Sequence, residues 1–141
     1  MEPVLDPRPR LDHIGIVVED VSEARRFFVE VLGLPVTRDE VSSLGNHIVG
    51  FQCGPVELEC IEVGDPMARL YRLGGARARI EHLGVQVSDL GAWVEATSKA
   101  GVATTTREQL HGRRGPYVWT EAVTSAGIPL EVVETEAIQE G

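Results

Sequence analysis

A histidine that follows an acidic residue and precedes alternating apolar residues occurs twice in this chain. The first copy, Asp12–Val21, reads DHIGIVVEDV, and the second, Glu81–Leu90, reads EHLGVQVSDL. The two histidines, His13 and His82, are 69 residues apart in a chain of 141 residues. A repeat with a period of about half the chain indicates two copies of one supersecondary unit.

Each half of the chain also ends in a similar apolar stretch that contains a glutamate. Glu59 lies in LECIE, and Glu131 lies in LEVVE 72 residues further on. Imidazole and carboxylate are ligand types for divalent Zn, Co, Mn, Ni or Fe, and two buried carboxylates without a cation would be costly. The simpler interpretation of one strand histidine is a hydrogen-bonded structural residue, but packing gives no reason for a duplicated His/Glu pattern. The pattern predicts one four-ligand metal site made of His13, Glu59, His82 and Glu131.

The hydrophobic pattern predicts the same order of elements in both halves. Apolar residues alternate from Leu11 to Val18, which is typical of a strand, and Asp20 then begins an apolar-striped helix. Three extended stretches follow, so each half reads strand, helix and three strands. The expected strands are 11–18, 35–41, 47–53, 56–63, 81–87, 103–107, 116–120 and 129–134, and the expected helices follow Asp20, Asp65 and Asp89, the first with a stripe of Ala24, Phe27, Phe28, Val31 and Leu32.

Two such modules fill one compact domain of this length. Three prolines interrupt any periodicity in the first ten residues, and the last six residues include two glutamates and a glutamine. The predicted layout is an N-terminal arm at residues 1–10, a first module at 11–64, a linker helix at 65–79, a second module at 80–135 and a tail at 136–141.

The amino-acid composition limits the kinds of partner that this protein can bind. The net charge of -9 argues against a nucleic-acid backbone, while 43% hydrophobic and 25% charged residues are ordinary for a soluble globular protein. No apolar run approaches the roughly 18 residues of a membrane span, and the N-terminus lacks a signal-peptide core. Cys53 and Cys60 lack metal-binding spacing and are expected as buried free thiols. We therefore expect a cytoplasmic protein with no nucleic-acid or membrane partner.

These stretches resemble the vicinal oxygen chelate superfamily, which includes glyoxalase I, extradiol dioxygenases and bleomycin-resistance proteins. Within it they most resemble the methylmalonyl-CoA epimerases, over residues 11–134, through both histidine strands, the closing LEVVE strand and DPMARLYRLGG at 65–75. The resemblance implies an α+β fold in which two βαβββ modules form a U-shaped mixed sheet around a divalent metal ion. It also implies a homodimer whose metal ligands are His13, His82 and Glu131, with Glu59 at the remaining ligand position.

Two departures from the epimerase pattern bear on the substrate and the base. Those enzymes often carry a His-Pro-Lys turn before the last strand, whereas this chain has TEAVTS at 120–125, without that basic contact for a CoA-type ligand. Where some of them carry a carboxylate base, this chain has Ile48. The neighbouring His47 is the candidate replacement, but strand alternation points neighbours to opposite faces, so a surface histidine is the simpler interpretation.

The resemblance implies an epimerase that moves a proton at a carbonyl-activated α-carbon through a metal-chelated enolate. The expected substrate is a small molecule such as a methylmalonyl-type acyl-CoA thioester, with Glu131 and His47 as the catalytic groups. The same scaffold hosts other chemistries. The alternatives are a glyoxalase-type lyase, another tailoring enzyme, an Fe(II) extradiol dioxygenase and a metal-free protein that sequesters a ligand.

Overall fold

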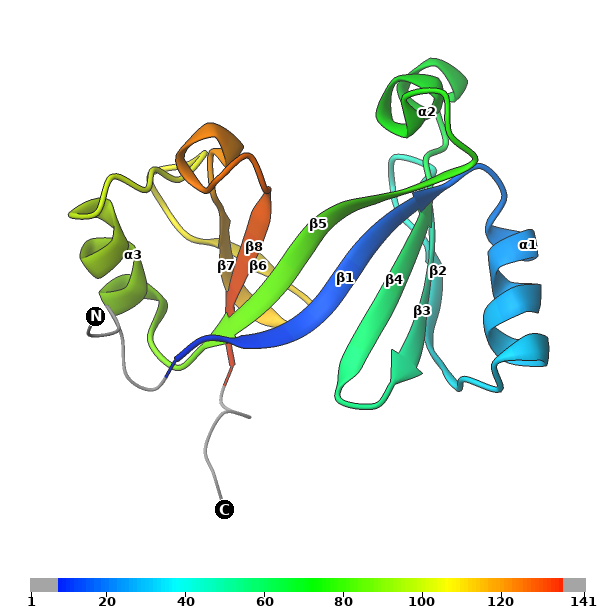
Figure 1. The fold of residues 1–141 in the computed structure, drawn as a ribbon, viewed down its shortest axis with the longest axis horizontal. Coiled ribbons are helices and arrows are strands. Elements are labelled where there is room, and N and C mark those ends of the chain that lie inside the picture. The colour runs from blue at the N-terminus through cyan, green and yellow to red at the C-terminus, as the bar shows by residue number, and fades with distance from the viewer. Residues whose placement is uncertain (1–7, 136–141) are drawn as a thin grey trace. The chain divides into compact units, whose positions relative to one another are not determined.

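The structure is a computed structural model that describes residues 8–135 (Figure 1). Within that range the chain divides into two compact units, residues 13–81 on one hand and residues 8–12 with 82–135 on the other. Residues 1–7 of the predicted arm and the whole predicted tail at 136–141 lie outside the described residues.

The first half of the chain folds as strand, helix and three strands. Strand β1 is parallel to β4, and β3 is antiparallel to both β2 and β4, so the strand order is β2-β3-β4-β1. The elements are β1 (Arg10–Val18), α1 (Val21–Arg25), a π-helix (Arg26–Val31), β2 (Val36–Val41), β3 (His47–Cys53), β4 (Val56–Glu62) and then α2 (Pro66–Leu73).

The second half repeats this topology. Strand β5 is parallel to β8, and β7 is antiparallel to both β8 and β6, in the order β5-β8-β7-β6. The duplicated sequence therefore has a duplicated topology, and the predicted α+β class with two βαβββ modules is confirmed. The elements are β5 (Ala78–Val87), α3 (Leu90–Ser98), β6 (Leu110–Gly112), β7 (Gly115–Trp119), a 3₁₀ helix (Ala122–Thr124) and β8 (Leu130–Glu134).

Each α-helix begins where an aspartate can cap it, as the sequence predicts. The Asp20 carboxylate accepts hydrogen bonds from two backbone N–H groups of α1, and Asp89 does the same for one N–H of α3. Asp65 caps α2, which has Pro66 in its first turn and ends at Gly74, where φ is +58°. A side-chain acceptor at the start and a left-handed glycine at the end satisfy backbone groups that a helix leaves unpaired.

Strand alternation gives each half a helix face, which packs against α1 or α3, and an opposite face, called here the site face. On the helix face of the first half, Phe51 and Cys60 pack with the helix residues Val21 and Phe28. In the second half Val132 packs with Leu90 and Trp93 in the same way. In the first half, the buried polar residues His13, Glu57 and Glu59 lie on the opposite site face.

The first helix departs from its predicted apolar stripe. Beyond Arg25 the backbone continues as a π-helix, in which the Leu32 N–H donates to the Phe27 carbonyl, five residues back. The wider turn rotates the following side chains out of helical phase. Ala24 and Phe28 pack against the core as predicted, but Phe27, Val31 and Leu32 are exposed.

The prediction of a strand at 103–107 is wrong. That segment makes one isolated bridge, Thr104 to Thr120, and the strand lies instead at Leu110–Gly112. The Thr104 and Thr106 hydroxyls donate to backbone carbonyls two residues ahead, at 2.7 and 2.8 Å. Such local bonds compete with a strand ladder for the backbone.

Both cysteines are free, as predicted, but only one is buried. Cys60 has no exposed surface, whereas Cys53 is exposed at the end of β3, so the prediction of two buried thiols is wrong for Cys53. No helix within residues 8–135 is long and apolar enough to cross a membrane.

Candidate functional site

His13 and Glu59 lie on the adjacent parallel strands β1 and β4. In their register His13 is opposite Glu57 and Gly15 is opposite Glu59, so both predicted ligands point to the site face of the first half. His13 is fully buried, and Glu59 is 6% exposed. The structure therefore brings together one buried imidazole and one buried carboxylate in this half.

His82 and Glu131 form the matching pair on the parallel strands β5 and β8. Gly84 is opposite Glu131, as Gly15 is opposite Glu59 in the first half. The His82 Nε2 lies 4.0 Å from Glu131 Oε1, and the side chains are 4% and 14% exposed. The sequence repeat is thus matched by a repeated placement of one histidine and one glutamate on neighbouring strands.

Thr37 and Arg38 of β2 contact the two glutamates Glu57 and Glu59 of β4, and no sequence pattern indicates these contacts. A register shift in β2 between Val36 and Arg38 marks a bulge at Thr37. The Thr37 hydroxyl donates to the buried Glu57 carboxylate at 2.5 Å, and Arg38 Nη1 lies 3.0 Å from Glu59 Oε2. A bulge has no clear signal in a single sequence, so these contacts were not predictable from the strand pattern.

In the second half, the residue opposite the glutamate on the neighbouring strand is aromatic. Trp119 on β7 is opposite Glu131, and its ring centroid lies 4.7 Å from that of His82, in an edge-to-face arrangement. Such aromatic contacts favour one ring orientation. Trp119 therefore restrains His82 and forms an apolar wall beside this His/Glu pair.

His47 is not on the site face. His47 is the first residue of β3 and pairs with Glu62 of β4. It lies two residues before Val49, which packs with Cys60 on the helix face, so His47 is on the helix face as well. Its Nε2 lies 2.7 Å from Asp39 Oδ1, and this hydrogen bond, helped by the charges of His47 and Arg25, lowers the pKa of Asp39. The structure does not bring His47 together with His13 and Glu59.

Burial controls the chemistry of Cys60, the residue next to Glu59. Burial, and secondly the charge of Glu59, raise the pKa of the Cys60 thiol to about 12. A thiol must lose its proton to bind a metal or to act as a nucleophile. Cys60 is therefore a core residue of the helix face and not a candidate ligand.

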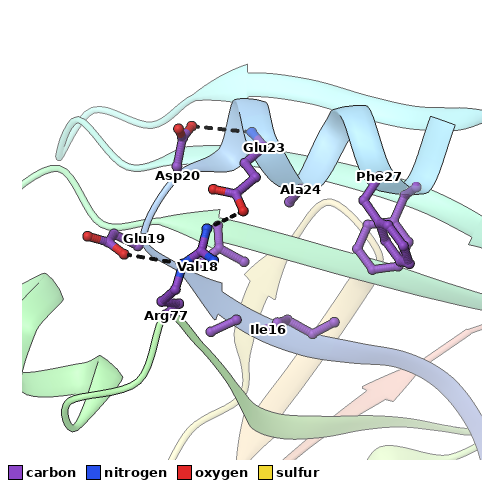
Figure 2. Close-up of a pocket in the computed structure, with 10 residues that line it drawn as sticks. Ile16, Val18, Glu19, Asp20, Glu23, Ala24, Phe27 and Arg77 are labelled. Carbon is purple, nitrogen blue, oxygen red and sulfur yellow. Dashed lines mark hydrogen bonds and ion pairs between the residues drawn. The ribbon is translucent and has the colours of Figure 1, made fainter. Parts of the chain in front are cut away.

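The cavity drawn in Figure 2 lies beside α1 in the first half. It has a volume of about 310 Å³, and its apolar lining includes Ile16 and Phe27. Arg77 at this cavity pairs with Glu23 and Glu19 (Figure 2). None of the predicted ligands lines it, so this cavity is separate from the site face.

Residues 10–131 match the family model of the Glyoxalase/Bleomycin resistance protein/Dioxygenase superfamily. The match spans most of the chain, and the paired βαβββ topology agrees with it. The chain belongs to this superfamily, which confirms the family that its histidine strands resemble.

Individual proteins resemble the chain over nearly its whole length. The Bacillus subtilis (strain 168) protein YqjC is 30% identical, over 92% of this chain and 95% of its own. The methylmalonyl-CoA epimerase of Mycobacterium tuberculosis has a TM-score of 0.77 at 22% identity, over 89% of this chain and 87% of that one. A methylmalonyl-CoA epimerase solved with methylmalonyl-CoA and NH4+ has a TM-score of 0.78 at 21% identity, over 94% and 99%. The two epimerases share the fold with this chain.

Proposed function

We propose that His13, Glu59, His82 and Glu131 bind one divalent metal ion. The observation that carries the proposal is the repeated His/Glu pair on parallel strands, one pair in each half. Imidazole and carboxylate suit Zn, Co, Mn, Ni or Fe, and His13, Glu59 and His82 are buried residues that each offer such a ligand atom. Buried carboxylates gain most from a cation, so this set of donors fits a metal.

The proposed reaction is the transfer of a proton at a carbon next to a carbonyl group, as in an epimerase. Superfamily membership and the fold shared with methylmalonyl-CoA epimerases support this class. When bound, a divalent ion supplies Lewis-acid stabilisation of an enolate. The proposed substrate is a small carbonyl compound, with a methylmalonyl-type CoA thioester as the first to test.

Glu131 is the proposed proton-transfer group. It lies on the site face, its side chain is 14% exposed, and Trp119 lies opposite it on β7. A carboxylate in such partly apolar surroundings can accept a proton from a carbon acid and return it. Ile48, where some epimerases carry their base, cannot do so. His47 remains a sequence prediction, and its contact with Asp39 on the helix face weighs against that role.

A glyoxalase-type lyase is the second candidate, because Glu59 completes a set of two histidines and two glutamates. In that reaction the same four residues would bind the metal ion, and the substrate would be a thiohemiacetal. The two candidates differ in substrate and not in metal site, so metal binding alone does not separate them. The tailoring enzyme, the Fe(II) dioxygenase and the metal-free sequestering protein remain further alternatives.

We also propose a homodimer in the cytoplasm. Phe27, Val31 and Leu32 of the first helical segment are exposed apolar residues, 48%, 68% and 51% respectively, and exposed apolar clusters favour a partner surface. The free thiols of Cys53 and Cys60 support a reducing compartment.

The metal proposal is tested through Trp119, because its ring contacts His82. Co²⁺ added to the metal-free protein should quench part of the tryptophan fluorescence, and a chelator should restore it. Trp119→Phe should abolish the change, because the remaining Trp93 belongs to α3 and packs in the core on the helix face. Quenching that persists in Trp119→Phe, or no quenching in the wild type alongside no binding by calorimetry, would count against the site.

The reaction is tested by solvent deuterium exchange at the α-carbon of methylmalonyl-CoA, followed by NMR. Exchange that needs the metal and is lost in Glu131→Gln supports the epimerase class. No exchange, together with consumption of a glutathione thiohemiacetal, would favour the lyase. Oxygen uptake by the Fe(II)-loaded protein with a catechol would favour the dioxygenase.

A further inference from the structure

We infer that Arg38 is a positioning residue that acts through Glu59: it is the counter-ion of Glu59 in the metal-free protein, and it lowers the affinity of the proposed site for divalent metals. This inference rests on the proposed metal site. It concerns a residue that lies two strands away from its partner, since Arg38 is on β2 and Glu59 is on β4.

The ion pair between Arg38 and Glu59 is largely buried. Arg38 Nη1 lies 3.0 Å from Glu59 Oε2, and the side chains are 13% and 8% exposed. The guanidinium also pairs with Glu40, whose side chain is 51% exposed. Removing one partner of a buried pair leaves an uncompensated charge, which is strongly destabilising. Arg38 therefore neutralises Glu59 when no metal is bound.

A glycine makes this contact possible. Gly50 on β3 is opposite both Arg38 and Glu59, so it lies between the two strands that they occupy. A Cβ atom at Gly50 would lie 2.5 Å from the Thr37 hydroxyl oxygen and 3.0 Å from Arg38 Cγ. The Arg38 side chain therefore passes over β3 at the one residue that has no side chain.

The second half has a large side chain, and not a glycine, at the matching position. Trp119 on β7 is opposite Glu131, as Gly50 on β3 is opposite Glu59. The two proposed glutamate ligands thus differ, because Glu59 has a guanidinium beside it and Glu131 has an aromatic wall.

This difference predicts how Glu59 responds to a metal. The guanidinium already pairs with the Glu59 carboxylate, so a metal ion held by that carboxylate would share its negative charge with Arg38. Two cations on one carboxylate repel each other, and Coulomb forces are strong where water is scarce. Arg38 should therefore weaken metal binding while it stabilises the metal-free protein, and so keep metal uptake reversible.

The experiment compares Arg38→Met with a matched control, Arg25→Met. Arg25 pairs with Asp39 at 2.5 Å, and both side chains are more than 40% exposed, so this control removes the same charge away from the site face. The affinity for Co²⁺ is measured by competition with a chelator, and the melting temperature is measured with and without metal. Arg38→Met should bind Co²⁺ on the order of tenfold more tightly and melt several degrees lower without metal. Arg25→Met should bind as the wild type does.

A double-mutant cycle tests whether Arg38 acts through Glu59. In a Glu59→Gln background the added Arg38→Met change should leave the Co²⁺ affinity unaltered, because the shared carboxylate is gone. A merely structural role would give the same change in both backgrounds and would overturn the inference. Unchanged or weaker binding by Arg38→Met alone would also overturn it.

Two further variants keep the test valid if Arg38→Met does not fold. Arg38→Lys retains the charge, so its Co²⁺ affinity should stay near that of the wild type. Gly50→Ala keeps every charge but crowds Arg38 together with Thr37 and Glu57, and should bind Co²⁺ more tightly. Failure of the wild type to bind any metal would overturn the proposed function itself, whereas normal wild-type binding with no effect of these changes would overturn only the role of Arg38.

Discussion

The side-chain carboxylate of Glu134 accepts a hydrogen bond from the backbone N–H of Leu90, the first residue of α3, at 3.0 Å. The first half contains the same contact, in which Glu62 accepts from Val21 at the start of α1, also at 3.0 Å. Each LExxE strand therefore has one glutamate on the site face and a second, three residues later, that caps the neighbouring helix. Strand alternation requires this division, because residues three apart point to opposite faces.

Replacing Glu134 by alanine should lower the free energy of unfolding by about 1 kcal/mol, because the first N–H of α3 loses its acceptor. Glu134→Gln should cost less, since the amide oxygen can still accept. Urea unfolding measures both changes. The control is Glu95→Ala on the outer side of α3, where the side chain is 75% exposed. Equal losses in Glu134→Ala and Glu95→Ala would contradict the cap.

Removing single metal ligands should weaken metal binding to different extents. The substitutions His13→Ala, His82→Ala and Glu131→Ala each remove one proposed ligand and should each reduce the affinity by at least about 10-fold. Calorimetry with Zn²⁺ and elemental analysis measure this. Glu59→Ala decides whether the fourth position is occupied, and an unchanged affinity would reduce the site to two histidines and one glutamate.

The two thiols should differ in reactivity. At pH 8 a thiol reagent should label the exposed Cys53 at once, and Cys60 only after unfolding, because Cys60 is buried and its pKa is raised to about 12. The raised pKa also makes stability depend on pH. The contribution of the protonated Cys60 thiol to stability is fully present below its unfolded pKa of about 9, and it is lost as the pH rises towards 12. Mass spectrometry of the labelled peptides checks the order, and rapid native labelling of Cys60 would contradict its burial.

His47→Gln should leave metal affinity unchanged, because His47 lies on the helix face beside Asp39. The same change should raise the pKa of Asp39 towards its ordinary value, since the hydrogen bond from His47 is what chiefly lowers it. The contribution of Asp39 to stability is present above its unfolded pKa and is lost as pH falls through the lowered folded value. Carboxyl NMR titration measures the shift. A large fall in kcat with full metal content would instead support His47 as the base.

A charge on the exposed apolar part of the first helical segment should weaken the proposed dimer. Val31→Lys places an ammonium group at a residue that is 68% exposed, so it should not disturb the core of the monomer. Light scattering of the wild type and the variant at micromolar concentration measures the mass. A monomeric wild type would contradict the dimer, and Glu30→Lys on the same segment serves as the charge control.

Much of the fold could be predicted from the sequence because its signals are local. The strand alternation of residues 11–18, the aspartates before the three helices and Gly74 after α2 each act within a few residues of their own position. The strand at 103–107 was predicted wrongly because the hydroxyls of Thr104 and Thr106 bond to the backbone instead. The exposure of Phe27 was missed because a π-helical turn has no clear sequence pattern.

For the candidate site, the repeated residues could be identified from the sequence alone: His13 with Glu59 and His82 with Glu131. This was possible because duplication leaves the same residue types at nearly the same spacing. The residues that lie beside each pair depend on the tertiary structure. The guanidinium that reaches Glu59 over Gly50 depends on strand order and on a bulge, and the Trp119 ring beside His82 depends on register. Strand order and register join residues far apart in the chain, so no local pattern specifies them.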